Sequence, residues 1–150
     1  MSDLRRLFSD IIRFETELWN AVDTRLRDEF ELPLARFEPM LVIAGHPACR
    51  VHDIATELVI TVGGTSKLVD RIEAAGHCRR RPNPADRRSS IIELTPAGER
   101  LVARAAAAFD EELQARLGDA VPQRSLAQFA ATLATLRGAG RSAARAEHAA

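Results

Sequence analysis

Apolar residues recur at every third or fourth position over residues 4 to 29, with charged residues between them. The series consists of Leu4, Leu7, Phe8, Ile11, Ile12, Leu18, Trp19, Val22 and Leu26. This spacing predicts a long amphipathic helix. Pro33 and Pro39 punctuate the next segment, and a short helix is expected to begin near Pro39 and to stop at Gly45.

Two helical patterns then follow within a short stretch of chain. Apolar residues mark a short helix over about residues 52–58, and Thr61 can act as the N-cap of a second helix that ends at Gly76. The second helix is expected to bury Thr65, Leu68, Val69 and Ile72 and to expose Gly63, Lys67, Asp70, Arg71 and Ala74. Two short helices joined by a tight turn, the second with a polar and basic outer face, predict a helix-turn-helix.

The segment after these helices has the pattern of a β-hairpin. Residues 78–82 and 90–94 are the expected strands, and the loop between them is rich in turn formers and charge. A hairpin in this position is called a wing.

The remaining residues predict two more helices. Thr95 and Pro96 open one as N-cap and first helical residue, and its apolar stripe ends at Gly118. The other is built on Leu126, Phe129, Leu133 and Leu136. Residues 138–150 contain almost no large apolar side chain, so we expect a disordered tail there.

The expected fold is therefore mainly α with a small β-hairpin wing, in one domain over residues 1–150. Within it, the winged helix-turn-helix is expected at about 36–95, and helices at about 4–30 and 96–137 flank it. Apolar residues at 46% and charged residues at 28% are typical of a globular domain. No apolar run approaches the ~18 residues of a membrane span, and the first residues lack a signal-peptide core. A soluble, cytoplasmic protein is expected.

Charge is balanced overall but is unevenly distributed. The chain carries 21 basic and 21 acidic residues, which excludes a uniformly basic nucleic-acid binder. Residues 61–94, however, hold seven basic side chains against four acidic ones, a net charge of +3. The positive charge therefore coincides with the predicted helix-turn-helix and wing.

Two segments resemble the MarR family of bacterial winged-helix regulators. Ser66 to Gly76 is similar to the family's recognition helix and its exit. Asp86-Arg87-Arg88-Ser89, followed by Leu94-Thr95-Pro96-Ala97-Gly98, is similar to its wing tip and to the start of its long dimer helix. The order of predicted elements agrees with the family from about residue 4 to about residue 137.

The resemblance implies a homodimeric regulator, a repressor whose DNA affinity falls when a small molecule binds. It implies that the terminal helices form the dimer, that recognition helices enter successive major grooves of an inverted repeat, and that Arg88, oriented by Asp86, reaches the minor groove. The family's effector site implies a pocket lined by Trp19, Phe37, Met40 and His46, for which plain core packing is the alternative.

The residues of the predicted recognition helix and wing support a DNA interface. Lys67 and Arg71 lie one turn apart and can contact guanine or phosphate, although a solvated helix face is the alternative. Arg79 and Arg81 share one strand face, expected toward phosphate, unless they only protect a strand edge. Gly63 and Gly64 lower the stability of the helix. Either they allow its backbone to approach a phosphate closely, or they are a local weakness that tertiary packing tolerates. The expected DNA-binding residues are Thr61, Gly63, Gly64, Ser66, Lys67, Arg71, Arg79, Arg81, Asp86, Arg87 and Arg88.

Other functions have weaker support in the sequence. His46, Cys49 and His52 are spaced three residues apart, and His77 and Cys78 add two possible ligands, so a zinc-responsive or redox-responsive regulator of the same fold is one alternative. A winged helix used as a protein-interaction module is another. No catalytic constellation or phosphate-binding glycine loop is present, so neither an enzyme nor a cofactor is expected.

Overall fold

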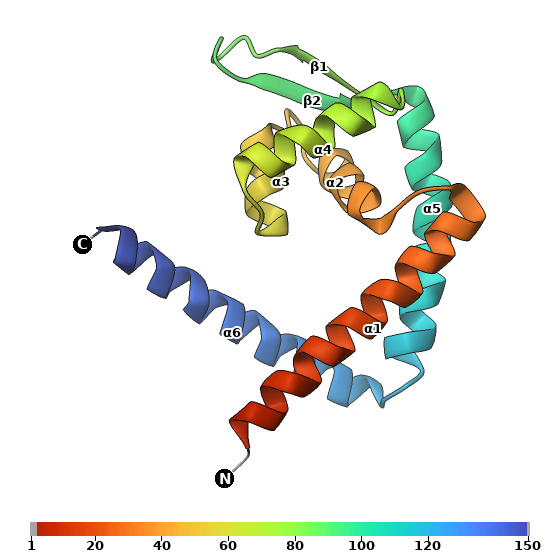
Figure 1. Ribbon diagram of the computed structural model, residues 1–150, viewed down its shortest axis with the longest axis vertical. Helices are drawn as coiled ribbons and strands as arrows, with labels where there is room; N and C mark the ends of the chain where they lie inside the picture. The colour runs from red at the N-terminus through yellow and green to blue at the C-terminus, as the bar shows by residue number, and fades with distance from the viewer. Residues whose placement is uncertain (1–2, 150) are drawn as a thin grey trace. The chain divides into compact units, whose positions relative to one another are not determined.

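The computed structural model describes residues 3–149 and contains the predicted helices and hairpin in the predicted order (Figure 1). The elements are α1 (Leu4–Phe30), α2 (Leu34–Gly45), α3 (Val51–Leu58), α4 (Val62–Ala74), β1 (Cys78–Pro82), β2 (Ser90–Leu94), α5 (Pro96–Leu113), the π-helical turn η1 (Gln114–Gly118) and α6 (Gln123–Ala149). The chain divides after Asp110 into two compact units, which are described separately. The mainly helical fold with a winged helix-turn-helix is confirmed.

The helix-turn-helix begins and ends on the residues that the sequence indicates. The Thr61 hydroxyl accepts a hydrogen bond from the backbone N–H of Gly64 at 3.0 Å and so caps α4. After the last turn, Gly76 takes a φ of 80°, the left-handed conformation that a C′ glycine adopts most easily. Ile54, Val69 and Ile72 are fully buried between these helices. Local capping and core burial therefore act together on α3 and α4.

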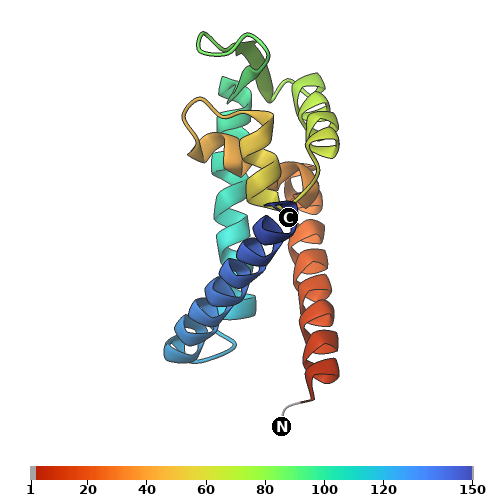
Figure 2. The same cartoon turned by 90° about the vertical axis from the view of Figure 1, so that its left-hand side faces the viewer.

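The wing is an antiparallel hairpin in which Cys78 pairs with Leu94 and Pro82 pairs with Ser90. Both strand ranges agree with the prediction. On the other edge of β2, the N–H of Ile92 donates to the carbonyl of Cys49 at 2.7 Å, so a single bridge joins the hairpin to the segment between α2 and α3. Figure 2 shows the hairpin at one end of the winged helix, where β2 leads into α5.

The start of α5 is joined to the end of α4 through Thr95. Its hydroxyl donates to the carbonyl of Gly76 at 2.6 Å and accepts from the N–H of Gly98 at 3.1 Å. A side chain at Gly98 would collide with the backbone carbonyl of His77, so only glycine permits this close approach. The Thr-Pro-x-Gly sequence thus fixes where the wing ends and α5 begins.

The second helix differs from its prediction. It begins at Leu34, and Pro39, expected near the start, lies inside it. An internal proline costs about 3 kcal/mol through its missing N–H and its ring. The burial of Phe37, Met40 and Ile43 offsets that cost, and the Asp23 carboxylate of α1 accepts from the Leu34 N–H at 2.8 Å. The true N-terminus of α2 is thus satisfied by a residue 11 positions earlier in the chain.

The C-terminal unit also differs from its prediction. The disordered tail expected from residue 138 is instead helical through Ala149, while Ala150 lies outside the described residues. Alanines such as Ala139, Ala144 and Ala146 are strong helix formers, so the segment needs no apolar stripe to continue α6. No helix among residues 3–149 is both long enough and apolar enough to cross a membrane.

Candidate nucleic-acid interface

The outer face of α4 carries two exposed cations. Lys67 and Arg71 are one turn apart, and within residues 3–149 neither side chain has an ion pair. Ser66 is half-buried next to them, on the side of α4 that faces the wing. Two long donors that are not neutralised by the chain itself remain available for an external anion or base edge.

The two glycines at the start of α4 have different environments. A Cβ at Gly64 would lie 3.0 Å from the Thr61 hydroxyl that caps the helix, so the cap itself favours glycine there. A Cβ at Gly63 would meet nothing within 4 Å. Packing therefore gives no reason for glycine at position 63, and both interpretations made from the sequence stay open for it.

Hydrogen bonds between residues close together in the sequence order the wing tip. One carboxylate oxygen of Asp86 accepts from the backbone N–H of Arg88 at 2.9 Å, and the Asn83 side chain donates to the Ser89 hydroxyl at 3.0 Å. The observed contact of Asp86 thus orients the Arg88 backbone. The side chains of Arg87 and Arg88 are exposed at the tip. The charged side chains thus extend into solvent from a structured turn.

Recognition helix and wing line one groove. A hollow of about 380 Å³ is bounded by Val62 and Ser66 of α4, by Arg80 and Arg88 of the hairpin, and by residues 50–52 at the start of α3. Two residues predicted from sequence, Ser66 and Arg88, are therefore brought together across this groove. Its lining also contains Arg80, which the sequence did not single out.

Arg79 and Arg81 lie on the other face of the hairpin. They share one face, as strand alternation predicts, but both point to Glu93, whose Oε1 atom lies 3.5 Å from Arg79 Nε and 2.9 Å from Arg81 Nε. Arg80, between them, faces α4 instead. Strand alternation alone separates Arg80 from its neighbours but does not say which face meets the recognition helix, so sequence reasoning missed it.

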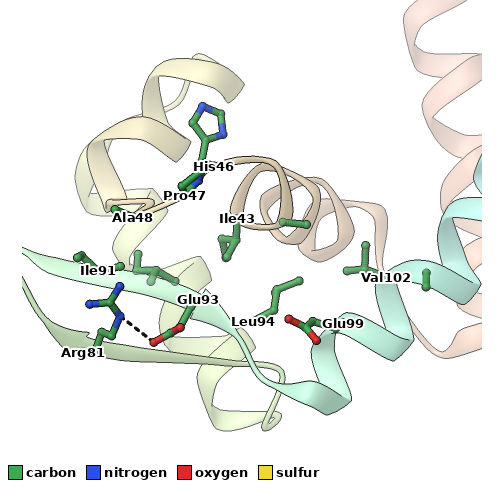
Figure 3. Close-up of a pocket in the computed structure, with 13 residues that line it drawn as sticks. Ile43, His46, Pro47, Ala48, Arg81, Ile91, Glu93, Leu94, Glu99 and Val102 are labelled. Carbon is green, nitrogen blue, oxygen red and sulfur yellow. Dashed lines mark ion pairs between the residues drawn. The ribbon is translucent and has the colours of Figure 1, made fainter.

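The face of the hairpin with Arg81 lines a second pocket, also of about 380 Å³ (Figure 3). Its walls come from the end of α2, from β2 and from the first turns of α5. They combine apolar residues with polar groups, as Figure 3 shows for Ile43, Leu94, Val102, His46 and Glu99. The imidazole Nδ1 of His46 lies 3.0 Å from the Val42 carbonyl oxygen, which can only accept, so Nδ1 is the donor in this contact.

The four expected effector residues are not brought together. His46 lines the pocket of Figure 3, whereas Phe37 and Met40 are fully buried, and Phe37 packs against Phe109 with ring centroids 5.3 Å apart. Trp19 is half-buried on α1 and lines neither pocket described above. Of the four, His46 lines one of the two pockets described here.

The thiols are buried and separated by β2. Burial, with a smaller contribution from the charge of Asp53, raises the pKa of Cys49 to about 11. Burial, followed by the charge of Glu73, raises the pKa of Cys78 to about 11 against the opposing effect of Arg80. Cys49 bridges one edge of β2 at Ile92 and Cys78 pairs with the other edge at Leu94. Two strand spacings separate them by at least about 10 Å, which is too far for a disulfide. Within the described part of the chain, no three His, Cys, Asp or Glu side chains form a group able to hold a metal ion.

Comparison with known families identifies the winged helix. Residues 32–89, which contain the helix-turn-helix and the wing tip, match the model of the MarR family. The winged-helix part of the chain is therefore similar to the MarR family. The resemblance of the recognition helix and wing is thereby confirmed.

Proteins similar in sequence to this chain include uncharacterized HTH-type transcriptional regulators of Bacillus. The protein YfiV of Bacillus subtilis is 25% identical over 73 residues, which cover 49% of this chain and 46% of the relative. A regulator of Bacillus cereus is 30% identical over 95 residues, covering 63% of this chain and 62% of the relative. The chain thus spans about half to three-fifths of the length of these relatives.

Several solved structures share the fold over most of the chain, and two of them, AbsC and Sco3205, are MarR family transcriptional regulators. AbsC of Streptomyces coelicolor superposes with a TM-score of 0.86 at 19% identity, covering 95% of this chain and 97% of AbsC. Sco3205 of the same organism, solved in complex with DNA, gives a TM-score of 0.83 at 21% identity and covers 89% of this chain and 84% of its own. CouR of Rhodococcus jostii, bound to p-coumaroyl-CoA, gives 0.77 at 24% identity, with 90% and 92% covered.

Proposed function

We propose that this chain is a sequence-specific, DNA-binding transcriptional regulator of the MarR family, which acts on chromosomal DNA in the cytoplasm. The observation that carries the proposal is the groove shared by α4 and the wing, with Lys67 and Arg71 exposed on the helix and Arg88 at the hairpin. A helix that presents cations to the major groove and a hairpin arginine beside it are the two parts of a winged-helix reader. The DNA-bound structure of Sco3205 has the same fold.

We propose further that the regulator is a homodimer. On α1, Leu4 and Phe8 are 72% and 67% exposed, and on α6 Phe129 and Leu136 are 46% and 59% exposed. Contiguous apolar faces of this kind are typical of an interface and unfavourable in water. A second copy of the chain would cover them in the arrangement that the family resemblance implies.

We propose that the regulator is a repressor released by a small molecule that binds in the pocket of Figure 3. The pocket joins the wing to the end of α2 and the start of α5, so an occupant would contact the elements that set the wing's position. Its apolar walls suit an apolar body. The carboxylate of Glu99 suits a hydrogen-bond donor or a cationic group.

Selection of bound sequences from random double-stranded DNA, at 0.15 M salt, tests DNA reading. The expected product is an inverted repeat with half-sites about 10 bp apart, because two recognition helices related by a two-fold axis must reach successive major grooves. Direct repeats or a single half-site would contradict the dimer. The absence of any salt-sensitive affinity would favour a protein-interaction module instead.

The variant Ala103→Trp tests the effector pocket. Ala103 is exposed at the wall formed by α5, so an indole there fills the pocket without disturbing the core. We expect the variant to bind the selected DNA as the wild type does. Small amphipathic amines that release the wild type from DNA should no longer release the variant, and continued release would move the effector site elsewhere.

A further inference from the structure

Arg80 reaches from β1 back to the recognition helix through four contacts. Its Nη2 atom lies 2.7 Å from Asp70 Oδ1, its Nη1 atom lies 2.9 Å from Glu73 Oε1, and Nη2 also donates to the Ser66 carbonyl at 3.3 Å. The backbone N–H of Arg80 donates to the second oxygen of Glu73 at 3.0 Å. One residue of the wing thus binds three residues of α4.

These contacts extend along the recognition helix. Ser66, Asp70 and Glu73 follow one another at spacings of four and three, so they form one stripe that covers two turns of α4. A planar guanidinium with fixed donor directions resists both sliding and rotation of the helix past the strand. Since Glu73 holds the backbone as well as the side chain of Arg80, the attachment involves the strand itself.

The charges in this cluster argue against a direct role in holding phosphate. Two carboxylates lie within 3 Å of the guanidinium, which is 25% exposed, whereas Arg88 on the same groove has no ion pair within residues 3–149. An arginine neutralised in this way gains little from a phosphate, because it would first have to give up its partners. An isolated exposed pair would contribute little, but this is a network of three side-chain contacts and one backbone hydrogen bond made by one residue.

We propose that Arg80 is a positioning residue that sets the distance between recognition helix and wing, and thereby determines which combination of half-site bases and flanking sequence the protein selects. This inference rests on the proposed function. In this proposal Arg71 reads bases from the helix and Arg88 reads groove width from the hairpin. A rigid link between them makes the protein prefer one spacing between the half-site bases and the flanking sequence.

Full-length Arg80→Ala tests this link on the selected duplex, on duplexes in which the flanking A·T step is moved by one base pair, and on scrambled DNA, each at two salt concentrations. We expect about tenfold weaker binding to the selected duplex and little preference for the position of the flank. Affinity for scrambled DNA and the salt slope should equal those of the wild type. Arg88→Ala is the matched control, whose salt slope should fall by about one unit.

A second variant, Glu73→Gln, removes the main partner and leaves the arginine in place. Positioning predicts the same loss of flank preference, with no further loss when both substitutions are combined. A direct phosphate contact predicts the opposite, because a guanidinium paired with Asp70 alone carries more net positive charge and would strengthen binding to selected and scrambled DNA alike. Arg80→Lys should not restore the preference, because a point charge cannot bridge both carboxylates.

Three results would overturn the proposal: a reduced salt slope in Arg80→Ala, equal losses on selected and scrambled DNA, or an unchanged flank preference. A wild type without any salt-sensitive affinity for DNA would instead overturn the proposed function together with it. Thermal unfolding of each variant distinguishes a lost spacing preference from a lost fold. Positioning requires that Arg80→Ala and Glu73→Gln lose the same flank preference.

Discussion

Large apolar residues are buried in the winged helix but are mostly exposed at the chain ends. In the winged helix, Phe37, Ile54 and Ile72 are fully buried within one chain. At the ends, the large apolar residues of the first turns of α1 and of α6 are mostly exposed, with Phe8 at 67% and Leu136 at 59%. Burial of apolar area is the main source of folding free energy. The winged helix therefore buries its core within one chain, whereas the exposed apolar faces at the ends fit the proposed dimer.

The largest effect is expected from a charge on the exposed face of α1. Each Phe8 side chain that leaves a dimer interface costs ~1.5–3 kcal/mol, and two-fold symmetry counts the loss twice, so Phe8→Glu should weaken dimerisation at least ~100-fold. Sedimentation equilibrium at micromolar concentration should show the monomer mass. Arg13→Glu, on the opposite face of the helix, should remain dimeric. A wild-type monomer would remove the contrast between the two regions.

Truncation of a core side chain tests whether the winged helix is stabilised within one chain. Phe37 is fully buried and packs against Phe109, so Phe37→Ala should lower the free energy of unfolding by ~3–5 kcal/mol. The change should be largely the same at all protein concentrations, because the contacts lie within one chain. The matched change Phe129→Ala should instead have an effect that depends on concentration. Urea unfolding at two concentrations measures both, and a concentration-independent effect of Phe129→Ala would contradict the interface.

Substitution of the arginines proposed to read DNA should change the binding free energy less than the changes above change stability. Arg71→Ala should cost ~1–3 kcal/mol at the best site and far less on scrambled DNA, because a bidentate contact to guanine is what it removes. Arg88→Ala should weaken binding to all sequences and relax the preference for flanking A·T steps. Equal losses of Arg71→Ala on both duplexes would make Arg71 a phosphate contact.

The smallest effect concerns the two thiols inside the winged helix. Their pKa is raised from 9.0 to about 11 in the folded chain, so above pH 9 the unfolded chain loses protons that the folded chain retains. Stability is therefore full below pH 9 and falls as the pH rises toward 11, by about 1 kcal/mol per thiol at pH 10. Because the chain has no tyrosine and a single lysine, few other side chains titrate in this range.

Urea unfolding at pH 7, 9 and 10 measures this loss. The double variant Cys49→Ala and Cys78→Ala should show a shallower decline above pH 9. An equal decline in the variant would mean that the thiols are accessible to water in the folded state, and the winged-helix interior less dry than its burial indicates.

Features that depend on neighbours along the chain were predictable. Both strands of the hairpin, the Thr61 cap, the Gly76 exit and the Thr95 cap follow from alternation, capping hydroxyls and glycine conformation, which act over a few residues. The resemblance of the wing sequence then supplied the family. The exposed cations Lys67 and Arg71 followed from helical periodicity, and Arg88 followed from the resemblance of the wing tip.

What the sequence by itself determined is thus the set and order of elements and the residues on their outer faces. Tertiary structure alone decided that α2 starts at Leu34, where Asp23 from α1 caps it, and that Pro39 is tolerated inside. It also decided that Arg80 faces α4 while Arg79 and Arg81 face Glu93. Strand alternation places neighbouring side chains on opposite faces, but only packing selects the face that meets the helix, because the partners lie up to 14 residues away.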